Sequence, residues 1–99
     1  MSVILGILAE EKERNERHKL NYLKELEQLP KGSIRKREKN GHAYYYLVYR
    51  KDGKIINQYI GKEGPKLESY REKLSKRHRY EAIVKNINSE LKIIGKILK

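Results

Sequence analysis

The sequence predicts an α+β fold: a long N-terminal helix, a three-stranded antiparallel sheet and a C-terminal helical segment. Three observations support this order. Apolar residues recur at helical spacing towards both ends of the chain, side chains alternate with a period of two in the middle, and two glycine turns divide that middle into three parts. With 99 residues, the chain is expected to form a single domain over residues 1–99.

The N-terminal helix is expected over residues 3–28. It begins with an apolar stretch, continues through a polar stretch whose opposite charges can pair along the helix, and resumes with leucines at helical spacing, Leu20, Leu23 and Leu26. Pro30 has no amide hydrogen to continue the helical ladder, and Gly32 follows it. We therefore expect the helix to end before Pro30.

The sheet is expected over residues 33–60. Asn40-Gly41 and Asp52-Gly53 are strong signals for two-residue hairpin turns, because both residues of each pair tolerate positive φ. The turns separate three strands, expected at residues 33–39, 42–50 and 54–60. This gives a meander with the second strand in the middle.

The C-terminal segment, residues 65–98, is expected to form one or two helices, with Pro65 in the first turn. Apolar residues then follow steps of four and three, and we call them the seam: Tyr80, Val84, Ile87, Leu91, Ile94 and Leu98. The seam needs a partner. This partner is either the apolar N-terminus, with Val3, Ile4, Leu5 and Leu8, or a second copy of the chain in a homodimer.

Two-residue turns would pair Lys39 with His42 and Lys51 with Lys54, which sorts the sheet residues into two faces. One is a core face with Ile34, Ala43, Tyr45, Leu47, Tyr49, Ile56 and Ile60. The other, which we call the Tyr/Arg face, carries Arg35, Arg37, Lys39, His42, Tyr44, Tyr46, Arg50, Asn57 and Tyr59, beside Val48 and Ile55. Arginine can engage phosphate through two parallel hydrogen bonds, and tyrosine can stack on bases. The Tyr/Arg face is therefore a candidate nucleic-acid surface.

The charge distribution agrees with a polyanionic partner. The formal net charge is +11, and residues 30–62 carry nine Lys or Arg against two acidic residues. A second basic cluster in the C-terminal segment could extend a phosphate track through Arg71, Lys73, Lys76, Arg77, His78 and Arg79. Two structural alternatives remain: the arginines could form ion pairs with residues such as Glu38, or the N-terminal helix could cover the face and make its tyrosines core.

Other chemistry has little support in the sequence. Cysteine is absent, the single aspartate, Asp52, belongs to a turn, and the histidines lack carboxylates at ligand spacing. We therefore expect no metal, no cofactor and no enzymatic activity. No apolar run reaches the roughly 20 residues of a membrane span, and the N-terminus lacks the basic leader of a secretory signal. We expect a cytoplasmic protein.

Part of the sheet region resembles a known family. The matching strings are Leu29-Pro30-Lys31-Gly32-Ser33, Gly41-His42-Ala43-Tyr44-Tyr45-Tyr46-Leu47, Tyr49-Arg50, Gly53-Lys54 and Tyr59-Ile60-Gly61-Lys62. They resemble a family of small uncharacterised prokaryotic proteins of mobile elements and, more weakly, the N-terminal segment of some insertion-sequence transposases. The strand order followed by a helix is similar to the DNA-binding sheets of phage integrase arm-binding domains. The first resemblance implies a mobile-element origin and no particular activity.

Two functional hypotheses follow. In the first, the chain is a module that binds DNA, in preference to RNA, through the Tyr/Arg face, with Arg77 and Arg79 at its flank. In the second, it is an inhibitor encoded by a mobile element that binds a host defence nuclease, such as a CRISPR effector, or the guide RNA complex of that nuclease. A homodimer through the seam is compatible with either.

Overall fold

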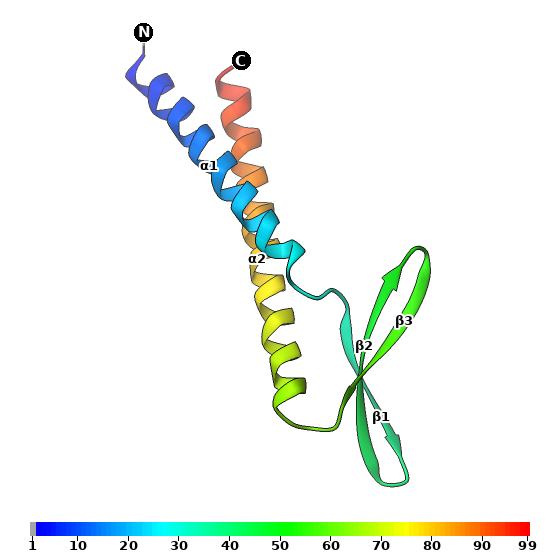
Figure 1. Ribbon diagram of the computed structural model, residues 1–99. Helices are drawn as coiled ribbons and strands as arrows, with labels where there is room; N and C mark the ends of the chain where they lie inside the picture. The colour runs from blue at the N-terminus through cyan, green and yellow to red at the C-terminus, as the bar shows by residue number, and fades with distance from the viewer. Residues whose placement is uncertain (1) are drawn as a thin grey trace. The chain divides into compact units, whose positions relative to one another are not determined.

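The computed structural model describes residues 2–99 and has the predicted element order (Figure 1). Helix α1 (Val3–Glu27) precedes strands β1 (Ser33–Lys39), β2 (His42–Lys51) and β3 (Lys54–Gly61), and helix α2 (Pro65–Ile97) follows them. The α+β prediction is confirmed, and the C-terminal segment is one continuous helix. The chain divides into two compact units, a sheet unit over Leu29–His78 and a helical unit that comprises residues 2–28 and Arg79–Lys99.

The three strands form an antiparallel sheet in the order β1-β2-β3. Lys39 pairs with His42 and Lys51 pairs with Lys54, so both hairpin turns contain two residues. Asn40 and Asp52, the first residues of these turns, have φ of 52° and 51°. Asn and Asp tolerate this left-handed conformation better than most residues, and the glycines after them adopt it freely. The predicted register is therefore present at both turns.

The core of the sheet unit lies between one face of the sheet and the first part of α2. Its buried members are Tyr45, Leu47, Ile60, Leu67 and Leu74, with Ile34, Ala43, Tyr49 and Tyr70 packed against them. Leu67 has no exposed surface, and complete burial of a leucine side chain contributes about 1.5–3 kcal/mol to stability. These contacts leave the Tyr/Arg face on the side of the sheet opposite to α2.

The helical unit consists of α1 and the second part of α2, which lie side by side and run in opposite directions (Figure 1). Two contacts fix their register. The Tyr22 and Tyr80 rings meet edge to face with centroids 5.0 Å apart, and Asn15 Nδ2 donates a hydrogen bond of 3.1 Å to Glu90 Oε2. The seam thus packs against α1 of the same chain.

Within the seam, Ile87 and Ile94 are buried, and its other four residues are half-buried. The part of α1 that covers the seam differs from the expected one. Val3 and Ile4 are 78% and 69% exposed, whereas Asn15 and Leu26 are the buried residues of α1. The reason is the antiparallel register, which places the first turn of α1 beside the end of α2, where few side chains remain to cover it.

Candidate nucleic-acid interface

The strand register brings all nine predicted residues of the Tyr/Arg face together. Arg35 of β1 pairs with Tyr46 of β2, and Tyr46 pairs in turn with Tyr59 of β3. The remaining members follow by alternation along the same strands, namely Arg37, Lys39, His42, Tyr44, Arg50 and Asn57. Within residues 2–99, no aspartate or glutamate is a member of this face. It therefore combines cations and aromatic rings without an opposing charge of its own.

The aromatic side chains form a connected cluster across β2 and β3. The Tyr46 and Tyr59 ring centroids are 5.4 Å apart, those of Tyr44 and Tyr59 are 6.4 Å apart, and those of His42 and Tyr44 are 6.5 Å apart. Tyr59 is 51% exposed, and Tyr44 and Tyr46 are half-buried. The cluster is thus a partly open aromatic surface, unlike the buried core that a covering helix would produce.

Arg37 reaches across the sheet from β1. Its guanidinium carbon lies 5.0 Å from the centre of the Tyr46 ring, and its Nη2 donates a hydrogen bond of 3.2 Å to Asn57 Oδ1 on β3. Both partners are neutral, so they hold the guanidinium in place without cancelling its charge. A positioned arginine loses less conformational freedom when it binds an anion.

The ion-pair alternative for the arginines does not fit the contacts in the sheet. Glu38 lies on the opposite face, where its Oε1 is 3.3 Å from Lys36 Nζ. Arg35 and Arg50 are exposed, and no carboxylate among residues 2–99 forms an ion pair with either of them. Their charges are therefore available to a partner.

Lys62 also belongs to the Tyr/Arg face, although it was expected to lie beyond the third strand. The pairing shifts between Tyr45 and Tyr46, so that Tyr45 pairs with Gly61 instead of Ile60. This bulge brings the residue after Gly61 into line with Tyr44, and Lys62 Nζ lies 5.7 Å from the centre of that ring. Gly61 has φ of 137°, which favours glycine.

The residues of the basic cluster of α2 lie in different surroundings. Arg77 is half-buried, and its Nη1 donates a hydrogen bond of 3.1 Å to the carbonyl oxygen of Leu29. It lies on the helix that covers the core face of the sheet, so it does not belong to the Tyr/Arg face. Arg79 is exposed and is part of the helical unit.

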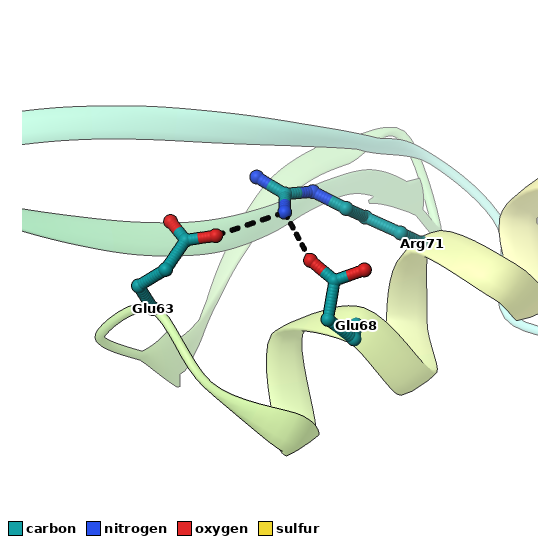
Figure 2. Close-up of polar contacts among 3 residues, drawn as sticks. All are labelled: Glu63, Glu68 and Arg71. Atoms are coloured by element: carbon teal, nitrogen blue, oxygen red, sulfur yellow. Dashed lines mark hydrogen bonds and ion pairs between the residues drawn. The ribbon is translucent and has the colours of Figure 1, made fainter.

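Arg71 is held between two glutamates (Figure 2). Its Nη1 lies 3.0 Å from Glu63 Oε1, in the loop before α2, and also contacts Glu68 Oε1 one turn earlier on the helix. Glu63 accepts a hydrogen bond from the Tyr45 hydroxyl, and this bond, together with the bond from Arg71, lowers the pKa of Glu63. The bond to Glu63 raises the pKa of Tyr45. The charge of Arg71 is thus neutralised by structural contacts, and we exclude it from the candidate site.

An open depression of about 550 Å³ lies on the Tyr/Arg face. It is lined by Lys39, Asn40, His42, Tyr44, Tyr46 and Tyr59. Asn40 is a further residue that sequence reasoning assigned only to a turn. Among residues 2–99 there is no group of three potential metal-ligating side chains, and none of the helices is long and apolar enough to cross a membrane.

More than half of the chain matches a known family model. The model of the family described as Domain of unknown function (DUF6788) matches residues 8–69, which extend from α1 through the whole sheet into the start of α2. No curated protein and no solved structure matches the chain.

Proposed function

The chain belongs to the DUF6788 family, and we propose that it is a non-enzymatic nucleic-acid-binding module that holds phosphates on the Tyr/Arg face. The observation that carries this proposal is the co-location of cations and aromatic rings on a face that has no acidic member within the described chain. Cations on phosphates release counterions and provide affinity, while aromatic side chains provide contacts to bases or sugars.

The contacts divide the cations of this face into two groups. Arg37 and Lys62 are positioned over tyrosine rings, whereas Arg35, Lys39 and Arg50 extend from the strands as exposed charges. The first group suits a fixed phosphate position, and the second suits neighbouring phosphates along a strand. We propose DNA as the preferred partner, with RNA as the alternative, and the cytoplasm as the place of action.

The test is a titration of labelled duplex DNA and RNA at salt concentrations between roughly 50 and 200 mM. The test variant combines Arg35→Ala, Arg37→Ala and Arg50→Ala. A matched control, Lys66→Ala, Lys85→Ala and Lys92→Ala, removes the same charge from exposed residues of α2. We expect wild type and control to bind with a steep salt dependence, and the test variant to lose affinity and about two to three units of the log–log slope.

Two outcomes would contradict the proposal. If the test variant and the control lose equal affinity, binding follows net charge and does not involve the Tyr/Arg face in particular. If wild type binds neither DNA nor RNA near physiological salt, the nucleic-acid function is wrong. The second hypothesis would then apply: the chain is an inhibitor encoded by a mobile element and should bind a CRISPR nuclease or its guide-loaded complex.

A further inference from the structure

We propose that the depression on the Tyr/Arg face accepts an unpaired nucleobase, so that the module binds single-stranded DNA more tightly than duplex DNA. This inference rests on the proposed nucleic-acid function and adds the class of substrate. It starts from the volume of the depression, about 550 Å³, which lies within the roughly 300–1,000 Å³ of pockets that hold small ligands.

The three tyrosines that line the depression differ in whether a cation lies over the ring. Arg37 lies over the ring of Tyr46, and Lys62 lies over the ring of Tyr44. Tyr59 has no such cation among residues 2–99 and is 51% exposed. Its two tyrosine neighbours meet it at interplanar angles of 45° and 60°, so neither stacks flat on it. Tyr59 is therefore the ring on which a planar base can stack.

The other lining residues suit the remaining parts of a nucleotide. Asn40 lies in the first hairpin turn, and its side-chain amide offers both a donor and an acceptor to the edge of a base. Lys39 adds a positive charge for the adjoining phosphate. Aromatic stacking for the base and a cation for the backbone are the combination by which proteins bind single strands.

A duplex cannot use this site in the same way. Each base in a duplex is covered on both sides by its neighbours in the stack, so Tyr59 can reach it only after the base has left the helix, which costs unstacking and unpairing energy. Duplex DNA would then contact the phosphate-binding cations alone. An unpaired strand can use the cations and Tyr59 together.

The experiment compares oligothymidylate of about 12 nucleotides, an abasic oligomer of the same length and the corresponding duplex, by fluorescence anisotropy of the labelled strand. The abasic oligomer has the same phosphates and lacks the bases. We expect wild type to bind oligothymidylate about 10- to 100-fold more tightly than the abasic oligomer. Tyr59→Leu should remove most of this difference, whereas Tyr59→Phe should keep it.

Ile55→Ala is the matched control, because Ile55 is on the same strand and the same face but does not line the depression. It should leave the preference unchanged. Equal affinity of wild type for oligothymidylate and the abasic oligomer, with a steep salt dependence for both, would overturn the base site and leave the phosphate-binding function intact. Absence of binding to all three oligomers would overturn both. The comparison on wild type needs no variant, so it is decisive even if Tyr59→Leu does not fold.

Discussion

Gly32 lies directly against the backbone of β2. It has φ of 113°, and a Cβ atom at this position would be 2.2 Å from the carbonyl oxygen of Val48 and 2.9 Å from the Cβ atom of Tyr49. Because the backbone of a central strand cannot move aside, we predict that Gly32→Ala destabilises the sheet unit by about 1–3 kcal/mol or more. Denaturant unfolding followed by circular dichroism would measure this loss.

Gly6→Ala is the control for Gly32→Ala. A Cβ atom at Gly6 would meet nothing within 4 Å, and Gly6 lies inside α1, where alanine is favoured over glycine by about 0.8–1.0 kcal/mol. The control should therefore be as stable as wild type or more stable. If Gly32→Ala had wild-type stability, Gly32 could not lie as close to the backbone of β2 as the structure places it.

Glu63 makes the stability of the sheet unit depend on pH. Its bonds from Tyr45 and Arg71 hold its pKa below the ordinary value of 4.5, and the same bond to Glu63 holds the pKa of Tyr45 above 10.0. The stabilisation by Glu63 is thus present above pH 4.5 and is lost as the pH falls through the lowered pKa. The stabilisation through Tyr45 is present below pH 10.0 and is lost as the pH rises through its raised pKa.

We predict that Glu63→Gln lowers the Tm at about pH 7 and that the difference from wild type shrinks as the pH falls below 4.5 and through the lowered pKa of Glu63. Thermal unfolding by circular dichroism at a series of decreasing pH values would measure the difference. Glu72→Gln, an exposed glutamate on the same helix, is the control and should show a smaller effect at pH 7. A Glu63→Gln difference that stays constant across this range would contradict the argument.

Among the elements, the sheet was the most predictable. Asn40-Gly41 and Asp52-Gly53 tolerate positive φ at both positions, as a two-residue type I′ turn requires. These turns fixed the register, and the register fixed the membership of both faces. The bulge at Tyr45 was not predictable, because Gly61 could equally have ended the strand. Lys62 was missed for that reason.

Contacts between residues far apart in the chain could not be predicted from the sequence either. Asn15 belongs to a polar stretch that was expected to be solvated, yet it is buried beside α2 and bonded to Glu90, 75 positions later. Arg71 was grouped with a basic cluster, although Glu63 and Glu68 neutralise it. A helical charge pattern shows which residues share a face, but it does not show which loop or helix that face will meet.

The pairing of α1 with the second part of α2 predicts a contrast between two adjacent residues. Ile94 is 7% exposed and belongs to the seam, whereas its neighbour Ile93 is 59% exposed. Ile94→Ala should lower the free energy of unfolding by about 2–4 kcal/mol, because it leaves a cavity between the helices. Ile93→Ala should change it by no more than about 0.5 kcal/mol. Chemical denaturation monitored by helical circular dichroism would measure both, and equal losses would mean that α1 does not cover the seam.

At the scale of the whole molecule, the packing of α1 on the seam makes a homodimer through the seam residues unfavourable. A dimer through the seam residues would have to displace α1, since α1 already covers them. Other apolar residues near the free ends of the two helices remain exposed, namely Val3, Ile4, Ile7, Ile93 and Ile97. In the antiparallel register of the helical unit, the first turns of α1 lie beside the last turns of α2. If the chain forms a homodimer, this end of the helical unit is the surface we propose for it.

Salt distinguishes this self-association from nucleic-acid binding. Two copies with a formal net charge of +11 repel each other, so screening by salt should strengthen an apolar contact between them, whereas salt should weaken binding to phosphates. We predict that sedimentation equilibrium shows a dimer fraction that rises with salt. The combination of Ile93→Glu and Ile97→Glu should abolish it, while Ile55→Glu, a change of an exposed isoleucine in the sheet unit, should not. A wild-type monomer at every salt concentration would contradict the homodimer and leave the Tyr/Arg face to act as a single copy.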